Sequence, residues 1–177
     1  GEDTPVASHE DIEDEDQTVH FPKVRTTAVA ENDEHLSMPN DPTKIVDRVY
    51  YENLLVGETY EVVGTLMNKA TGKPIKDNDK DVIESRVTFV ADKADGYIDI
   101  EFNINASEFL NNTLVAFEEL YHDSRLVGTH KNMEDEDQSV HFPKIRTSAV
   151  FEDGTRVLKT QADTEVVTII DTVSYEN

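Results

Sequence analysis

The residues of this chain that could do chemistry are a threonine, a glutamine, a histidine and a few acids that fall within strand-like segments. A hydroxyl, a carboxamide, an imidazole and carboxyl groups are the set needed for nucleophilic attack with proton transfer. In KIVDRVYY, a period of two places Ile45, Asp47 and Val49 on one face. A carboxyl group on an apolar face must be paired, hydrogen-bonded or neutral, so we expect Asp47 to have an internal partner.

Two further polar residues share apolar faces. Gln138 alternates with Val140 and Phe142, so we expect it to be buried. Thr26 lies between Val24 and Ala28, and the small Ala28 would let a facing strand approach the Thr26 hydroxyl.

The choice of acid is open at one position. In TLVAFEELYH both faces are apolar apart from one glutamate each, Glu118 and Glu119, and periodicity does not choose between them. Taken singly, a strand Thr or Gln is typical of a solvated or ladder residue. The combination of Thr26, Gln138, an Asp, a Glu and a His indicates a reaction centre.

The elements that must position these residues are strands. Turn residues such as Asn, Asp, Gly and Pro separate segments rich in β-branched and aromatic residues. The predicted strands are 24–30, 44–53, 59–68, 85–91, 96–104, 113–122, 125–130 and 138–143, with one helical turn over 106–112. About seven or eight short strands in about 120 residues predict an all-β, immunoglobulin-like β-sandwich.

A repeat sets the domain organisation. The segment from His9 to Val29 returns, mostly identical, from His130 to Val150, and position 26 is Thr in both copies (Thr147), whereas Thr27 becomes Ser148. A period of about 120 residues is typical of tandem whole domains. We therefore interpret 1–23 as the C-terminal strand and linker of one repeat, 24–142 as a complete domain, and 143–177 as the N-terminal strands of the next.

Composition excludes several classes of function. The 177 residues include 38 Asp and Glu against 16 Lys and Arg, for a net charge of -22, with no Cys. Such a polyanion is repelled by nucleic acid and by anionic membranes, and we expect neither as a partner. No apolar run approaches the length of a membrane helix, and no secretion signal is visible. Without Cys, disulfides, thiolate zinc sites and cysteine nucleophiles are excluded.

Several spaced motifs resemble one family. They are VRTTA (24–28), VDRVYY (46–51), GETYEVVGTLM (57–67), LVAFEEL (114–120) and the spacing from His130 to Gln138. In this order they are similar to the VaFE-repeat, Thr–Gln ester-bond domains of Gram-positive surface adhesins. The resemblance covers essentially all of 24–142.

The resemblance implies an intramolecular ester that forms autocatalytically. Carried over by position, Thr26 is the nucleophile, Gln138 the electrophile, His130 the assisting base, and Asp47 and Glu118 the acid pair, with Glu119 as the rival of Glu118. Chemically, His130, which Asp47 could orient, would activate the Thr26 hydroxyl, and a protonated carboxyl would stabilise the oxyanion on Gln138. Two buried carboxyls close together would share a proton. No cofactor or metal is expected.

The same resemblance implies a stalk module on the cell wall of a Gram-positive bacterium. Its partners would be adjacent repeats of the same polypeptide, and a domain outside these residues would bind the host ligand. The flanking segments carry half-sites, His9 with Gln17 and Thr147 with Asp171. We expect these not to form a proper site with each other, because neither segment contains a VAFEEL strand.

Two alternatives remain. One is a Lys–Asn isopeptide-bonded domain, but Lys44 and Lys69 lie at strand ends and no Lys occupies an inward register as clearly as Thr26. The other is a calcium-stiffened interaction module that uses KDNDKD (76–81) or EDEDQ (134–138), since alternating carboxylates suit calcium.

Overall fold

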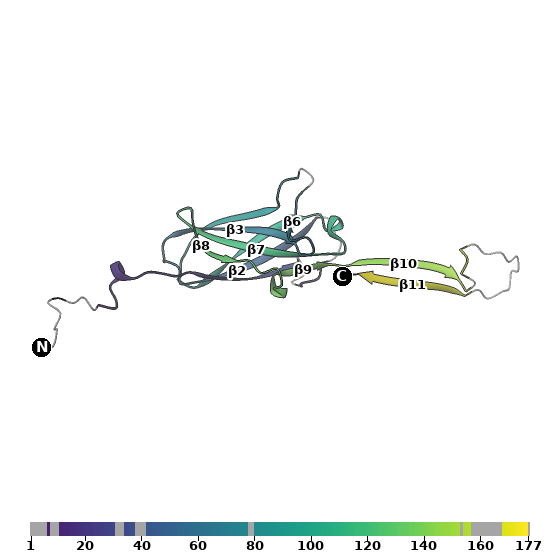
Figure 1. The fold of residues 1–177 in the computed structure, drawn as a ribbon, viewed down its shortest axis with the longest axis horizontal. Coiled ribbons are helices and arrows are strands. Elements are labelled where there is room, and N and C mark those ends of the chain that lie inside the picture. Colours follow the sequence, from purple (N-terminus) through teal and green to yellow (C-terminus); the bar gives the residue numbers. More distant parts are fainter. Residues whose placement is uncertain are drawn as a thin grey trace.

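The computed structural model describes residues 7, 11–30, 34–37, 42–77, 80–152, 154–156 and 168–176. Two sheets form a β-sandwich at the centre of the molecule (Figure 1). The segment that precedes the first strand leaves one end of the sandwich, and a two-stranded hairpin extends from the other. The prediction of an all-β, immunoglobulin-like sandwich is confirmed.

The described residues contain eleven strands and three short 3₁₀ helices. The strands are β1 (Lys23–Ala30), β2 (Thr43–Glu52), β3 (Thr59–Asn68), β4 (Lys73–Pro74), β5 (Glu84–Val90), β6 (Gly96–Ile104), β7 (Asn112–His122), β8 (Arg125–His130), β9 (Ser139–Phe142), β10 (Lys144–Phe151) and β11 (Ile169–Glu176). The helices are η1 (Glu15–Gln17), η2 (Ala106–Phe109) and η3 (Glu136–Gln138). No helix in the described part of the chain is long and apolar enough to cross a membrane.

The two layers differ in size. One is a three-stranded antiparallel sheet in the order β1-β2-β6. The other runs β4-β3-β7-β8, with β5 also paired to β3 and β9 also paired to β7. Strand β1 is therefore an edge strand of its own sheet, and it packs against β8, β9 and η3 of the other layer.

Alternation of side chains places the polar candidates in the core, as predicted. In β1 the buried residues are Val24, Thr26, Ala28 and Ala30, and every second residue of β2 from Thr43 to Tyr51 is buried. Asp47 therefore faces the other sheet in the company of apolar neighbours.

The observed strand begins one residue later than the strand predicted over 138–143. Gln138 is the last residue of η3, and β9 starts at Ser139. Ser139 is fully buried, and its hydroxyl donates to the Asp135 carbonyl oxygen at 2.8 Å. The short strand β4 is not among the predicted strands.

Gly64 of β3 leaves space at the centre of the sandwich. It is paired with Glu118 of β7. A Cβ atom at position 64 would meet the side chains of Ile100 and Phe102 in the facing sheet at less than van der Waals separation. A side chain there would push the two sheets apart.

We therefore predict that Gly64→Ala destabilises the sandwich by about 1–3 kcal/mol through overpacking. Urea unfolding measures the change, with Ser85→Ala as a control on the strand next to Gly64. Equal unfolding midpoints for the two variants would show that the space is not needed.

Candidate functional site

Four polar side chains meet between the two sheets. Thr26 comes from β1, Asp47 from β2, Glu118 from β7 and Gln138 from the end of η3. Thr26 is 5% exposed and the other three are 0% exposed. The structure thus brings together four of the five predicted site residues in one buried cluster, which we call the Thr26 cluster.

Backbone pairing explains why these groups can approach. Asp47 stands opposite Ala28 in the β1–β2 ladder, and Glu118 stands opposite Gly64 in the β3–β7 ladder. Small residues beside each acid leave room for the carboxyl groups in an otherwise close-packed interior.

Hydrogen bonds connect the hydroxyl, the amide and one acid. The Thr26 hydroxyl donates to Glu118 Oε2 at 3.1 Å. The Gln138 Nε2 amide lies 2.8 Å from Thr26 Oγ1, 2.8 Å from Glu118 Oε2 and 2.8 Å from the Ala116 carbonyl oxygen. Since the amide has two hydrogens, one of them is shared between two acceptors. Glu118 Oε2 therefore contacts both the hydroxyl and the amide nitrogen.

The cluster is short of hydrogen-bond donors. Asp47 Oδ1 and Oδ2, Glu118 Oε1 and Gln138 Oε1 receive no hydrogen bond from the described residues while both carboxyl groups are deprotonated. A proton on Glu118 Oε1 is compatible with both contacts at Oε2 and supplies a donor. Buried oxygens without donors are costly, so the cluster favours holding a proton.

Electrostatics lead to the same conclusion. Burial raises the pKa of Asp47 to about 6, although Glu118, Thr26 and the positive charge of His130 act in the opposite direction. Burial also raises the pKa of Glu118 well above its usual value, and the Asp47 carboxylate raises it further. Ionising both carboxyls in this dry space is unfavourable, so the pair holds one proton at neutral pH.

His130 lies beside the cluster but makes different contacts from those expected. Its Nε2 lies 3.0 Å from Asp135 Oδ2, and its Nδ1 lies 3.4 Å from the Val24 carbonyl oxygen. The expectation that Asp47 orients the ring is therefore wrong in this structure, since Asp135 holds it. In this arrangement the hydroxyl of Thr26 is bonded to Glu118 rather than to His130.

Asp135 is the residue that sequence reasoning missed. Besides holding His130, its Oδ1 accepts the Asp137 amide at 3.0 Å and caps η3, which carries Gln138. It stands in the acidic run EDEDQ, which is typical of a solvated loop. The sequence signal that could have identified Asp135 was its position five residues after His130 within the repeated segment.

The rival residues lie elsewhere. Glu119 pairs with Lys131 and accepts the Tyr121 hydroxyl at 2.9 Å, and the Lys131 contact lowers the pKa of Glu119. Thr27 is half-buried and lines a hollow on the outer face of the β1-β2-β6 sheet. Thus Glu118 rather than Glu119, and Thr26 rather than Thr27, belong to the cluster.

The half-sites are separate. Gln17 ends η1 and is exposed, while Thr147 and Asp171 are exposed on β10 and β11. The pairing of Ala149 with Asp171 repeats that of Ala28 with Asp47. His9 lies outside the described residues. That these half-sites do not combine into a working site stays a prediction.

The alternatives find little support in the described residues. Each lysine there is exposed or half-buried; Lys44 pairs with Glu101 at 2.9 Å and Lys69 with Glu136 at 2.7 Å. A Lys–Asn bond would need a buried lysine. The same part of the chain contains no group of three acidic or histidine side chains that could hold a metal ion, although positions 78 and 79 of KDNDKD lie outside it.

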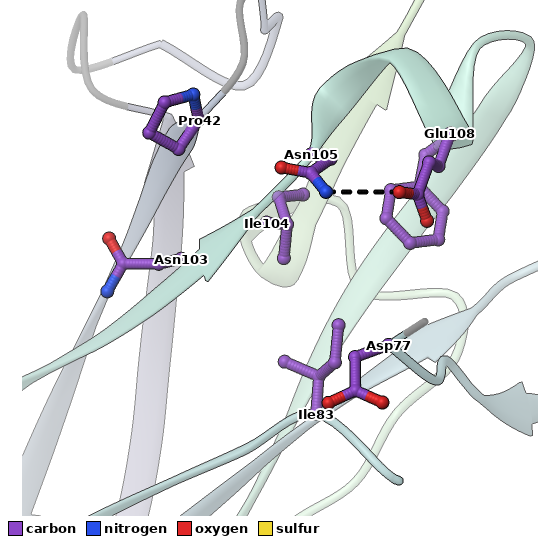
Figure 2. A pocket seen from close by; sticks show the side chains of 8 residues that line it. Pro42, Asp77, Ile83, Asn103, Ile104, Asn105 and Glu108 are labelled. Carbon is purple, nitrogen blue, oxygen red and sulfur yellow. Dashed lines mark hydrogen bonds between the residues drawn. The ribbon is translucent and has the colours of Figure 1, made fainter. Parts of the chain in front are cut away.

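A cavity of about 200 Å³ lies away from the Thr26 cluster, near η2 and the end of β6 (Figure 2). Two of its polar side chains satisfy each other, since Asn105 Nδ2 donates to Glu108 Oε1 at 3.0 Å. Ile83, Ile104 and Phe109 provide its apolar lining.

The raised pKa of Asp47 makes stability depend on pH. A carboxyl whose pKa is higher in the folded protein contributes stability below its unfolded pKa of about 4, and this contribution is lost as the pH rises through about 6. We predict that Thr26→Ala/Asp47→Asn gains stability relative to Thr26→Ala as the pH increases from 4 to 7. Thermal unfolding of both variants across this range measures the difference. A difference that stays constant with pH would contradict the shared-proton arrangement.

Comparison with known proteins places the chain in a family. No match was found among curated proteins. Two crystal structures of a bacterial adhesin from Mobiluncus mulieris, containing intramolecular disulfide, isopeptide and ester bond cross-links, resemble the fold. One has 15% sequence identity and a TM-score of 0.56, and the match covers 88% of this chain and 76% of that one. The other has 14% identity and a TM-score of 0.58, covering 88% and 75%.

The family model described as "T-Q ester bond containing domain" matches residues 1–21, 22–142 and 143–177. These ranges together span the chain. With a Thr and a Gln in buried contact inside the central range, we conclude that the chain belongs to the family of T-Q ester bond containing domains.

Proposed function

We propose that this chain is a stalk module of a surface adhesin that joins Thr26 to Gln138 through an ester bond, without a cofactor. The observation that carries the proposal is the 2.8 Å contact between Thr26 Oγ1 and the Gln138 amide nitrogen inside a fully buried cluster. The nucleophile and the leaving group are therefore adjacent before reaction, which removes most of the entropic cost of bringing them together.

Glu118 is the proton carrier in this reaction. Its Oε2 contacts the Thr26 hydroxyl at 3.1 Å and the Gln138 amide nitrogen at 2.8 Å. When the pair's proton lies on Asp47, the Glu118 carboxylate takes the hydroxyl proton as Thr26 Oγ1 bonds to Gln138 Cδ. Glu118 then gives that proton to Nε2, the C–N bond breaks, and ammonia leaves. One O–C bond forms, one C–N bond is lost, and all protons are accounted for.

Asp47 stabilises the negative charge that develops on Gln138 Oε1. That oxygen has no hydrogen-bond partner among the described residues, so a proton held by Asp47 is the donor we assign to the tetrahedral intermediate. His130 is held by Asp135 at 3.0 Å and contacts the Val24 carbonyl oxygen of β1 at 3.4 Å, so we assign it a positioning role beside Thr26 rather than a proton-transfer step.

The product persists because the site is dry. All four groups of the Thr26 cluster are buried, so water has poor access to the ester once ammonia has left. The protein consumes its own side chains, and the reaction is a single turnover rather than a catalytic cycle.

The bond would reinforce the sandwich mechanically. Thr26 and Gln138 are 112 positions apart, and closing a loop of this size stabilises a fold by about 4–5 kcal/mol in the chain-entropy model. The link joins β1 to the segment that leads into β9, which are the first and last strands of the sandwich. A pulling force on the two ends would therefore pass through the ester and spare the strands between.

This role fits a tandem array. We propose that 24–142 is one module, that 1–23 closes a preceding one, and that 143–177 opens the next, so that its partners are adjacent repeats. The array would extend from the wall of a Gram-positive bacterium, and a domain outside these residues would bind the host ligand. The likeness in fold to an adhesin supports this setting.

An ester between Thr26 and Gln138 lowers the mass of the folded protein. The folded protein should be lighter than its sequence mass by one ammonia, and mild alkaline hydroxylamine, which cleaves esters far faster than amides, should open the link. Thr26→Ala should have the full mass, whereas Thr27→Ala, its matched control on the opposite face of β1, should keep the deficit. A deficit that survives hydroxylamine, or that persists in Thr26→Ala, would overturn the ester in favour of an isopeptide.

Substitution of Glu118 tests its role as the proton carrier. Glu118→Gln removes the proton carrier, and cross-linking should slow by about 10²–10⁴-fold, as is typical for loss of a general acid–base. Glu119→Gln, one residue along the same strand, should react at the rate of the parent. Intact mass at successive times after cell-free synthesis of each variant gives both rates, because a protein that has already lost ammonia cannot react a second time. Similar rates for the two variants would remove Glu118 from the mechanism.

A further inference from the structure

Asn53, directly after β2, reaches back to the residues that precede β1. Its Oδ1 lies 3.1 Å from His20 Nδ1, and its Nδ2 donates to the Phe21 carbonyl oxygen at 3.3 Å. Both ends of one side-chain amide therefore bind the two residues before Pro22. These contacts join segments more than 30 positions apart in the chain.

The backbone holds Asn53 in place for these contacts. Its φ is 62°, in the left-handed region where Asn is one of the few residues found often. Its amide donates to Asp95 Oδ1 at 2.8 Å, which fixes the turn against the β5–β6 connection. The side chain thus points to the start of β1 from an anchored position.

Strand β1 is firmly tied to β2 at the same end. Lys23 lies 3.9 Å from Glu52, and the Arg25 guanidinium lies over the Tyr50 ring at 4.0 Å. Pro22, between the His20–Phe21 pair and β1, has a fixed φ. The residues on both sides of this proline are therefore held by the same end of the sandwich.

The repeat shows what His20 and Phe21 correspond to. Their counterparts, His141 and Phe142, are the last two residues of β9, and only Pro143 separates them from β10. Phe142 is 0% exposed in the core, whereas Phe21 is 79% exposed. His20 and Phe21 thus have the sequence of a closing-strand end. In the complete module His141 Nδ1 lies 3.0 Å from Thr113 Oγ1, and the Phe142 carbonyl oxygen accepts the Asn111 amide. Within an array, the second lone pair of the Phe carbonyl oxygen is therefore the acceptor that Asn53 uses.

We propose that Asn53 is a docking residue for the closing strand of a preceding repeat, so that the joint between consecutive repeats is a built contact rather than a free hinge. The partner is the His-Phe end of a β9-type strand in a second module of the same kind. The proposal rests on the tandem-array function given above. A fixed joint would hold neighbouring modules in one orientation and make the stalk stiff against bending as well as stretching.

The absence of Cys from the chain makes a clean test possible. Spin labels on Val19→Cys, before the joint, and Lys73→Cys, on exposed β4, report the distance distribution between the N-terminal segment and the sandwich by pulsed electron paramagnetic resonance. Asn53→Gly removes both side-chain contacts and still tolerates the positive φ. Asn111→Gly is the matched control: Asn111 is exposed, has φ 64°, and contacts the end of β9 through its backbone amide rather than the His20–Phe21 segment.

The doubly labelled parent and Asn111→Gly should give one narrow distribution. In Asn53→Gly the docked population should fall by about tenfold, since two surface hydrogen bonds are lost, and a broad component should appear. A broad distribution in the parent, an unchanged one in Asn53→Gly, or equal broadening in Asn111→Gly would overturn the proposal. Intact mass of the same samples reports the Thr26–Gln138 link, so failure of the joint and failure of the ester are seen separately.

Discussion

Burial of two carboxyl groups beside a hydroxyl and an amide is the constraint on which this structure depends. Asp47 comes from one sheet and Glu118 from the other, so the sandwich cannot close without placing them in the same dry space. Neither carboxyl can ionise freely, and in the proposed reaction one of them accepts a proton while the other donates a hydrogen bond. Gly64 and Ala28, which stand opposite the two acids, leave the space that the arrangement needs.

The topology determines what a bond at this place would do. Thr26 is on an edge strand, and Gln138 directly precedes β9, so the two groups lie at the seam where the layers meet. A bond there would join β1, the first strand of the sandwich, to the segment that leads into β9, the last strand. The contacts of Asn53 with His20 and Phe21 lie just outside this seam. The proposed cross-link and the proposed joint would together let the module carry force along a chain of copies.

The strands and most of the Thr26 cluster were predictable from the sequence. Alternation in β1 and β2 placed Thr26 and Asp47 inward because these strands have one apolar face each. Alternation does not indicate which residues of β7 face the core, because both faces of this strand are apolar: one packs in the core and the other is largely covered. Only the pairing of β7 with β3 and β8 distinguishes Glu118 from Glu119. Asp135 was missed because a carboxylate in an acidic run has no periodicity to mark it, and its role depends on the three-dimensional approach of His130.

Peptide mapping of the folded protein shows whether Thr26 and Gln138 are joined. Trypsin cleaves after Arg25 and Lys44 and after Lys131 and Lys144, so Thr26 and Gln138 fall in the peptides 26–44 and 132–144. We expect tandem mass spectrometry to find these two peptides joined, lighter than their sum by one ammonia, with fragment ions that place the link at Thr26 and Gln138. Recovery of both peptides separately and unmodified from the folded protein, or a link that begins at a lysine, would contradict it.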